Sequence, residues 1–370
     1  MSKQEDIRKS ITELMVNALK QGTPPWRKAW VSGTAGGLPC NFQSGRRYTG
    51  INPLILMFWS AVRGYESRFW GSYSSWMKNV GAHVMRGEKS VSITLFNMIP
   101  KRDPVTKKIE NNKKGENVLI PIMKEFPVFN AQQLKVPTPE ELLDGRCKNR
   151  ELSVIKSLLE IDDKKERSEV STKSELMQIA GKYLSKLICQ HLETREQIAN
   201  AIHEKLSENL KKYLTNEIVI NKDPDFQPAE DFIEATGAKI SYSGDRAFFN
   251  VSSNEIVVPK KGRFETIQSF YETVFHELIH WQLEKTGWKG EYAMGELIAE
   301  IGACFLLTSL NVPLADKMLD NSVSYVKSWL KSMNDNPKFI FDAASLASKC
   351  VDQMLVDTNV CEETPIQSVA

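Results

Sequence analysis

Two histidines four residues apart constrain this chain more than any other feature. His276 and His280 enclose Glu277 in the pattern His-Glu-x-x-His. Residues four apart share one face of a helix, so both imidazoles can bind a single ion while the glutamate lies beside it. Apolar residues recur through the same segment at helical spacing, namely Ile267, Tyr271, Val274 and Leu278. The pattern therefore predicts an amphipathic helix that carries two metal ligands and a general base.

A second helix downstream is expected to supply the third ligand. Gly287 and Gly290 let the chain turn, and a new helical pattern opens near Tyr292, in which Glu296 and Glu300 lie at i and i+4. Like charges at this spacing repel each other unless a cation neutralises one of them. We expect Glu296 to be the third ligand and Glu300 to orient a ligand histidine. The opposite assignment, with Glu300 as the ligand, stays open.

Two imidazoles and a carboxylate are the donor set of a catalytic zinc site, which leaves the fourth position for water. We therefore expect one Zn²⁺ per chain. An open zinc site lowers the pKa of water towards ~7, and Glu277 could then take the proton as general base and pass it to a leaving amine. The motif is short enough to occur by chance, so the prediction of a zinc site rests on the helices in which the motif lies. The ligand spacing does not establish peptide hydrolysis.

The charge of the chain is distributed unevenly. The whole sequence carries +2, but residues 1–130 carry +11 and residues 131–370 carry −9. Such asymmetry indicates that the N-terminal third faces nucleic acid.

The basic third also combines aromatic rings with cations. Lys and Arg neutralise phosphates while Trp and Tyr stack on unpaired bases, so the mixture predicts binding of single-stranded nucleic acid. The candidate residues are Trp26, Lys28, Trp30, Arg46, Arg47, Tyr48, Asn52 and Lys89. Core packing is the competing interpretation for each tryptophan, because Trp is highly buried on average. Trp59 lies in an apolar run and is expected in the core.

Hydrophobic periodicity indicates an α+β fold in three parts. The expected parts are an N-terminal α+β domain at 1–135, a helical connector at 136–217 and a metal-site domain at 218–370. In the first part, helices are predicted at 4–21, 53–63 and 73–80, and strands at 91–96 and 118–122. The basic loop 101–114 joins these strands, either as a solvated hairpin tip or as a phosphate contact.

The remaining elements follow from the same patterns. Helices are expected at 151–160 and 173–187 in the connector, which has no catalytic constellation. In the third part, a helix is expected at 228–235, strands at 239–243, 247–251 and 255–259, and closing helices near 322–333 and 341–355. The strand at 255–259 precedes the metal helix, where a sheet edge could pair with an extended peptide.

Length, cysteine usage and hydropathy set the remaining expectations. A chain of 370 residues is long enough for more than one domain. Its six cysteines form no Cys-x-x-Cys pair and are expected to be reduced thiols in a cytoplasmic protein. No apolar run is long enough for a membrane span, and the first twenty residues lack the apolar segment of a signal peptide.

Two blocks of sequence together resemble a known family. The N-terminal block resembles the N-terminal domain of ArdC-type antirestriction proteins and TraC primases; it comprises Pro25, Trp26, Trp30, Pro39, Asn41, 48–52, Trp70 and 87–89. The C-terminal block resembles the zincin-type metallopeptidase domain of ArdC and phage polyvalent proteins; it comprises 254–259, Phe264, Tyr271, 276–281, Tyr292 and 296–305.

The resemblance implies a single-stranded DNA-binding domain joined to a zincin-like metallopeptidase domain. Such a protein is carried by a plasmid, phage or other mobile element and protects incoming DNA from host restriction. The resemblance also implies the ligands His276, His280 and Glu296 and the base Glu277. Restriction enzymes or other DNA-bound proteins are the expected protein partners, and no membrane is expected.

Three functions are compatible with these residues. The first is an antirestriction protein that coats or marks transferred single strands, with zinc supporting the fold or a limited proteolysis. The second is an active zinc protease, tethered to DNA, that cuts DNA-bound proteins. The third is a replication-associated DNA-binding module with structural zinc, which would have no use for Glu277 as a base.

Overall fold

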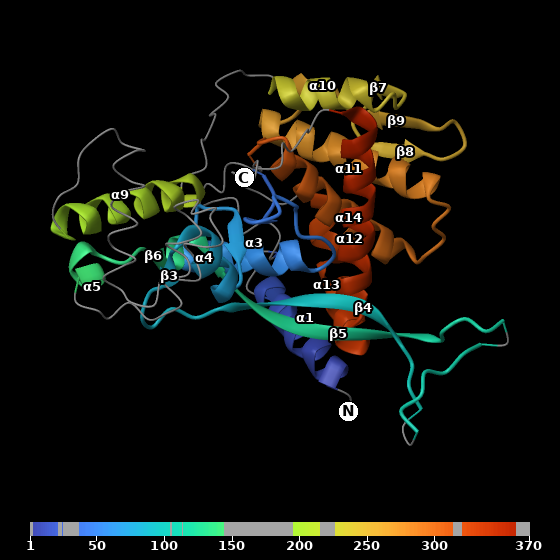
Figure 1. Ribbon diagram of the computed structural model, residues 1–370. Coiled ribbons are helices and arrows are strands. Elements are labelled where there is room, and N and C mark those ends of the chain that lie inside the picture. The colour runs from blue at the N-terminus through green and yellow to red at the C-terminus, as the bar shows by residue number, and fades with distance from the viewer. Residues whose placement is uncertain are drawn as a thin grey trace.

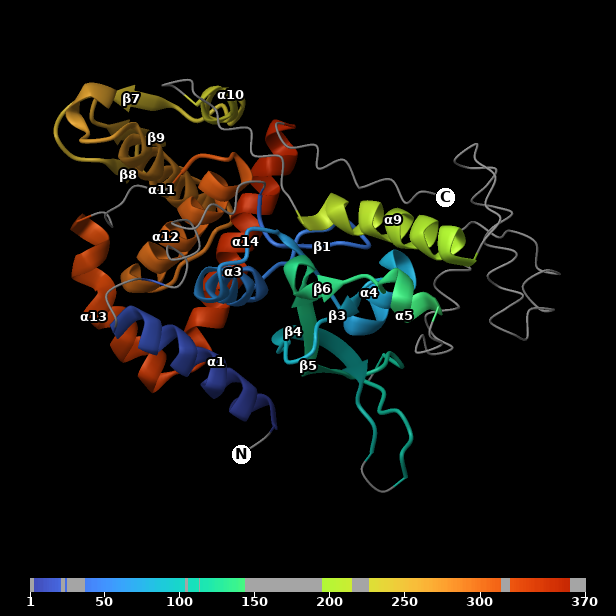
Figure 2. The same ribbon diagram turned by 90° about the vertical axis from the view of Figure 1, so that its left-hand side faces the viewer.

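The two halves of the chain lie side by side in the computed structural model, which describes residues 3–20, 24, 37–103, 106–112, 114–143, 195–214, 226–313 and 320–359. Figures 1 and 2 show a C-terminal body of packed helices, an N-terminal half beside it, and a two-stranded ribbon that extends away from both. The candidate residues Trp26, Lys28 and Trp30 lie outside the described residues.

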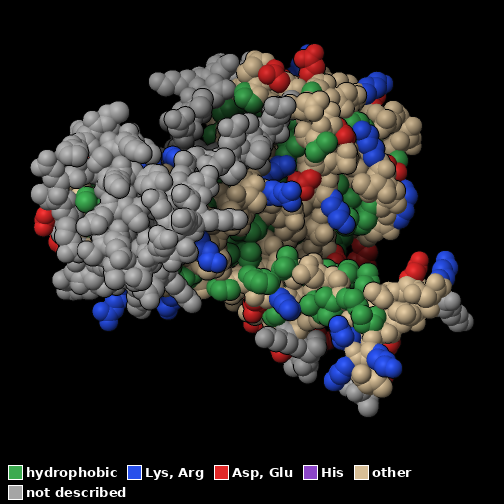
Figure 3. Space-filling view, viewed as in Figure 1, with side chains coloured by type: hydrophobic (Ala, Val, Ile, Leu, Met, Phe, Trp, Pro, Cys, Tyr) green, Lys and Arg blue, Asp and Glu red, His purple; other side chains and the backbone are tan. Residues whose placement is uncertain are grey.

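Two small sheets form the strand framework of the described N-terminal half. The larger has the order β1-β2-β5-β4 and the smaller pairs β3 with β6. Their bounds are β1 (Cys40–Asn41), β2 (Phe69–Gly71), β3 (His83–Val84), β4 (Val91–Pro100), β5 (Leu119–Asn130) and β6 (Leu134–Lys135). The strands predicted at 91–96 and 118–122 are confirmed in place, but both are longer, because the antiparallel ladder between them continues beyond the alternating pattern. Hydrophobic side chains cover much of the resulting ribbon (Figure 3).

Five described helices belong to the first 214 residues. They are α1 (Lys3–Lys20), α3 (Asn52–Arg63), α4 (Tyr73–Val80), α5 (Pro139–Leu143) and α9 (Arg195–Leu214). The end of α3 is fixed by Gly64, which adopts the left-handed conformation (φ +70°) that glycine tolerates best. α9 packs on α4 and α5, so the described end of the predicted connector adds to the N-terminal half. The helices expected at 151–160 and 173–187 lie outside the described residues.

The C-terminal half places a three-stranded sheet on a bundle of helices. Its elements are α10 (Gln227–Ala235), β7 (Ile240–Tyr242), β8 (Phe248–Asn250), β9 (Glu255–Val258), α11 (Ile267–Lys285), α12 (Tyr292–Ser309), α13 (Asp320–Asp335) and α14 (Phe339–Thr358). The strand order is β7-β9-β8, so β9 is the central strand. The expectation that the strand at 255–259 offers a sheet edge is therefore wrong. The edge strand next to α11 is β8, which runs antiparallel to β9.

The metal-motif helix α11 is buried on nearly every side. Every residue from Phe270 to Leu283 except His280 is buried, because the sheet covers one side of the helix and α12 and α14 cover others. The prediction of an amphipathic helix is therefore wrong, although the helix itself is confirmed. α12 crosses α11 closely at Gly302, where an added Cβ would lie 2.8 Å from the Ile279 side chain. Gly302 thus permits the close approach that brings the two helices of the metal motif together.

α12 is also apolar enough, by length and composition, to cross a membrane, yet 78% of its most apolar window is buried inside the protein. This burial is the behaviour of a core helix.

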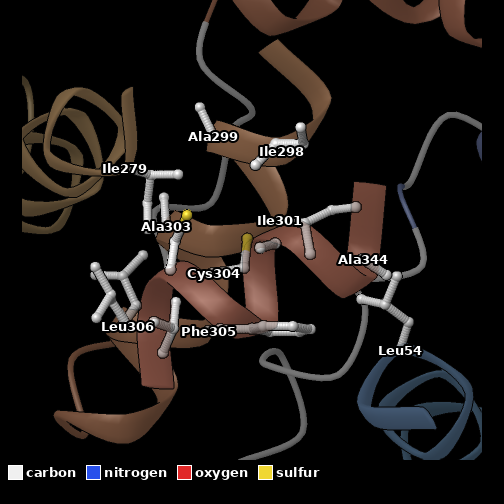
Figure 4. Packing of buried hydrophobic residues seen from close by; sticks show 14 of the residues in the cluster. Leu54, Ile279, Ile298, Ala299, Ile301, Ala303, Cys304, Phe305, Leu306 and Ala344 are labelled. Carbon is white, nitrogen blue, oxygen red and sulfur yellow. The ribbon is translucent and has the colours of Figure 1, made fainter. Parts of the chain in front are cut away.

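One hydrophobic core extends across both halves. Leu54 of α3 faces Ala344 of α14 (Figure 4), and α1 lies against α13. The Thr12 hydroxyl donates a hydrogen bond of 2.8 Å to the carbonyl oxygen of Pro337. The two halves therefore share buried surface, while the exact domain boundaries of the three-part division remain a prediction.

The core interpretation is correct for the tryptophans that the structure describes in the basic third. Trp70 and Trp76 are completely buried, and Trp59 is half-buried beneath the Arg63 guanidinium, 4.6 Å from its ring centre. Trp70 and Trp76 therefore stabilise the fold and leave no face free for a base, while Trp59 packs partly against the core.

Candidate metal centre and nucleic-acid surface

Three donor groups from α11 and α12 converge at one point. The Nε2 atoms of His276 and His280 lie 3.1 Å apart. One carboxylate oxygen of Glu296 lies 3.4 Å from His276 Nε2 and the other lies 3.5 Å from His280 Nε2. The helical spacing of the histidines places them on one face of α11, and the crossing at Gly302 brings Glu296 opposite them.

These distances suit a tetrahedral divalent ion. Bonds of about 2.0–2.1 Å at tetrahedral angles separate neighbouring donor atoms by about 3.3 Å. The two Nε2 atoms are 3.1 Å apart, and each lies 3.4 or 3.5 Å from a different oxygen of Glu296, so each histidine has a carboxylate oxygen close to that distance. Because all three side chains are largely buried, their mutual approach is set by the packing of two core helices. His276, His280 and Glu296 therefore fit a metal ion with no rearrangement of the backbone.

Glu300 lies behind the centre. Its carboxylate is 3.9 Å from Nδ1 of His276, the ring nitrogen that points away from the shared donor point. At this distance the carboxylate acts on the imidazole through its charge rather than through a hydrogen bond, and it increases the basicity of the ring. The geometry therefore favours Glu296 as ligand and Glu300 as the supporting group.

The sequence analysis placed Tyr292 at the start of a helix but did not predict that it contacts a metal ligand. Its hydroxyl is hydrogen-bonded to the Glu296 carboxylate and lies 3.2 Å from the hydroxyl of Tyr325 on α13. Tyr292 precedes Glu296 by one helical turn, so the i, i+4 spacing was a signal that could have revealed it. No sequence signal links Tyr325, which comes from another helix.

Glu277 lies beside the donor point and faces β8. The backbone N–H of Phe249 donates a hydrogen bond to its carboxylate, while burial raises the pKa of Glu277 above its ordinary value. A carboxylate with a raised pKa is a stronger base than an ordinary carboxylate, which suits a general base. The edge strand thus contacts the group expected to carry the proton.

The two histidines titrate in opposite directions without a metal. Burial opposes protonation of His276, but its hydrogen bond to Glu296 and the charges of Glu277 and Glu300 outweigh burial and raise its pKa to about 9. Burial and the neighbouring charge of His276 lower the pKa of His280 to about 4. One proton is therefore held between His276 and Glu296, at the position that a cation would occupy.

A cleft of about 710 Å³ opens from this centre to the surface. Its walls include the β8 residues Phe248 and Phe249 and, opposite them, Trp288. The Trp288 ring occupies the space where a Cβ on Gly290 would lie, at 2.0 Å, so Gly290 is needed for this wall. A cleft of this size, with the edge strand β8 on one side, can hold an extended peptide.

The candidate nucleic-acid residues divide into two groups. Arg47, Tyr48 and Asn52 line one pocket of about 630 Å³ at the base of the β4–β5 ribbon. Arg46 and Lys89 are exposed and do not line it. The structure thus brings three of the predicted side chains together and leaves two as separate surface cations.

Each of the three pocket residues already has a structural partner. Arg47 forms an ion pair of 3.4 Å with Asp352 of α14. The Asn52 carboxamide bonds the backbone N–H and carbonyl of Thr94, both at 2.8 Å. The Tyr48 hydroxyl lies 3.4 Å from the Trp70 carbonyl oxygen, and burial raises its pKa to about 12. The sequence predicted three residues that line this pocket, but it did not predict that each of them also bonds another part of the protein.

Both halves match known families. Residues 227–346 match a family described as zincin-like metallopeptidase, and residues 5–129 match the N-terminal domain of anti-restriction factor ArdC. The chain is therefore similar to ArdC-type proteins: a region that matches the ArdC N-terminal domain is followed by one that matches a zincin-like metallopeptidase domain.

The solved structure of a whole ArdC protein supports this assignment. The metal-free crystal structure of antirestriction ArdC from the R388 plasmid is 26% identical and matches with a TM-score of 0.61, over 96% of this chain and 98% of that one. A Mn(II)-bound structure of the same protein matches with a TM-score of 0.57. Together with the zincin-like domain, that structure suggests divalent metal binding.

Curated relatives align along nearly the whole chain. A DNA primase TraC of Escherichia coli is 27% identical over 98% of this chain, and the chain spans 28% of that primase. The uncharacterized protein y4eC of Sinorhizobium fredii is 21% identical over 99% of this chain and 96% of its own length. The chain thus covers less than a third of the primase and nearly all of y4eC.

Proposed function

We propose that this protein is a zinc-dependent peptidase carried on a single-stranded DNA-binding domain, and that it protects incoming DNA of a mobile element from host restriction. The observation that carries the proposal is the convergence of His276, His280 and Glu296 beside Glu277 in an open cleft. Similarity to ArdC supports the antirestriction role, and similarity to TraC primases supports DNA binding.

The residues of the cleft divide the chemistry between them. When bound, one Zn²⁺ would supply a Lewis acid that polarises a peptide carbonyl and acidifies water. His276, His280 and Glu296 would hold it, and Glu300 would orient His276. Glu277 would take the proton of the attacking water and deliver it to the leaving amine. β8 would lie alongside the bound peptide as the edge strand of the sheet.

The protein substrates are inferred from the two halves together. DNA-bound proteins, with restriction enzymes among them, meet the cleft when the N-terminal half holds a strand. The shared core keeps the two halves in a fixed arrangement, so binding of DNA concentrates the cleft near proteins on the same strand.

Glu277→Ala tests the enzyme. The change preserves all three ligands, so metal and single-stranded DNA binding should persist while peptide cleavage falls by roughly 10²–10⁴. Cleavage of a restriction enzyme in the presence of Zn²⁺ and single-stranded DNA would be followed by mass spectrometry. His280→Ala serves as the metal-free comparison.

Protection in cells separates the proposal from the two other functions. If Glu277→Ala protects transferred DNA as well as wild type, proteolysis is not the mechanism, and a coating role remains. If His280→Ala also protects fully and only DNA-binding variants fail, the metal site is dispensable for protection, and DNA binding alone accounts for it.

A further inference from the structure

The β4–β5 ribbon exposes six large hydrophobic side chains. They are Leu95, Phe96, Met98, Ile99, Leu119 and Phe126, with exposed fractions between 37% and 54%. Figure 3 shows this apolar stretch, with Lys and Arg side chains near its far end. Contiguous apolar surface on a projecting element indicates contact with a partner.

The two faces of the ribbon differ in charge. Leu95 is paired with Lys124, and Thr94 with Glu125. Because successive residues of a strand point to opposite faces, Phe126 shares its face with Lys124, while Phe96 shares the other face with Glu125. We call them the Lys124 face and the Glu125 face. Along the paired strands, no acidic residue alternates onto the Lys124 face.

The Lys124 face leads from a pocket to a basic loop. Leu95 and Phe126 line the pocket of about 630 Å³ at the base of the ribbon, together with Tyr73 at the start of α4. Tyr73 and Phe126 are each 41% exposed, and Asn41 and Gln43 add polar groups to the same pocket. At the other end, the loop between the strands presents the exposed cations Arg102, Lys107, Lys108 and Lys114.

We propose that single-stranded DNA lies along the Lys124 face, with one base in the pocket against Phe126 and Tyr73 and its phosphates passing Lys124 towards the basic loop. This inference rests on the proposed function and names the DNA site within it. Unpaired bases stack on exposed rings, and cations along the same track neutralise the backbone. A pocket of a few hundred Å³ is large enough for one base with its sugar.

Charge complementarity favours DNA over a second copy of this chain on that face. A nucleic-acid strand needs cations beside stacking rings, and the Lys124 face has both. The Glu125 face carries similar apolar area with a carboxylate, which repels phosphates. The Glu125 face therefore serves as a control for DNA binding by the Lys124 face.

The test compares two phenylalanines of the same ribbon. Phe126→Ala and Phe96→Ala remove the same ring from opposite faces, and both rings are exposed, at 41% and 54%. Binding of the full chain to a fluorescent oligothymidine is measured by anisotropy. Phe126→Ala should weaken binding about tenfold or more, whereas Phe96→Ala should stay within about twofold.

Lys124→Gln and Glu125→Gln form a second matched pair. Loss of one phosphate contact should reduce the slope of log K against log salt by about 0.7 in Lys124→Gln. Glu125→Gln should leave the slope unchanged. Melting curves of all four variants identify any change that acts through folding.

Three outcomes overturn the inference. Unchanged binding by Phe126→Ala, while wild type binds the oligonucleotide, places the DNA site elsewhere and leaves the proposed function intact. Equal losses in Phe126→Ala and Phe96→Ala remove the distinction between faces, and sedimentation then shows whether the ribbon pairs two copies. Absence of binding by wild type contradicts the DNA-binding part of the proposed function itself.

Discussion

The metal centre and the ribbon pocket are assembled in different ways. The centre takes its donors from two consecutive helices, α11 and α12, that are buried in the core. The pocket draws its lining from the segments near residues 41–52, 72–75, 93–95 and 126–128. Two packed helices bring the donor groups of the first site within 4.8 Å of one another, whereas the second site depends on how separate segments of the chain meet.

The difference also separates two kinds of charged residue. At the centre, the buried Glu296 carboxylate lies beside His276 and His280, and the three side chains form a candidate cation site. At the pocket, Arg47 is already paired with Asp352, so its charge joins the halves of the molecule. A cation in a basic sequence is therefore not by itself a phosphate contact. The predictions below test this contrast.

Removal of a ligand should have the largest effect. His280→Ala should lower the affinity for Zn²⁺ at least 100-fold, because loss of one of three ligands exceeds the 10- to 100-fold cost of losing a supporting group. Calorimetric titration measures the affinity, and melting with and without a chelator measures the coupled stability. His203→Ala is the control, since its Nδ1 bonds the Pro137 carbonyl far from the centre. One zinc per chain in His280→Ala would exclude this ligand set.

The affinity for metal should rise with pH by about tenfold per unit up to pH 9. Without metal, His276 holds a proton below its pKa of about 9, and a metal must displace it. The stability of the metal-free protein should change in the opposite direction. Because folding raises the pKa of His276 from 6.5 to about 9, protonated His276 stabilises the folded state. This stabilisation is complete below pH 6.5 and is lost as the pH rises through 9. Titrations in buffers of different ionisation enthalpy count the released proton; no release at pH 7 contradicts the prediction.

Tyr292→Phe should weaken metal binding about tenfold while preserving the fold. The change removes the hydroxyl that bonds the Glu296 carboxylate and leaves the exposed ring in place. Tyr325→Phe is the matched control, because its hydroxyl contacts Tyr292 but not the ligand. Equal affinities in wild type and Tyr292→Phe would show that the hydroxyl has no part in positioning Glu296.

The smallest expected effect is on stability, and it distinguishes the adjacent residues Arg46 and Arg47. Arg47→Gln should lower the free energy of unfolding by about 1 kcal/mol, the upper range for a partly exposed ion pair. Arg46→Gln should leave stability unchanged, since Arg46 is exposed. Chemical denaturation measures both. A larger loss of stability in Arg46→Gln than in Arg47→Gln would show that Arg46, rather than Arg47, stabilises the fold.

The sequence predicted which side chains converge at the candidate metal centre. The i, i+4 spacing of His276 and His280 and the place of Glu296 on the following helix follow from helical geometry, which acts over a few residues. The same local rules located the helices of the C-terminal half and the two strands of the ribbon. They also favoured the core for the tryptophans, as Trp70 and Trp76 confirm.

The tertiary structure decided the features that depend on contacts between distant segments, which local sequence patterns cannot predict. The burial of α11 on nearly all sides, the central position of β9 and the pairing of Arg47 with Asp352 depend on contacts between distant segments. Tyr325 reaches Tyr292 only because α13 packs on α12. Strand order and side-chain partners are set by which surfaces exclude water together, and the period of a single segment does not contain that information.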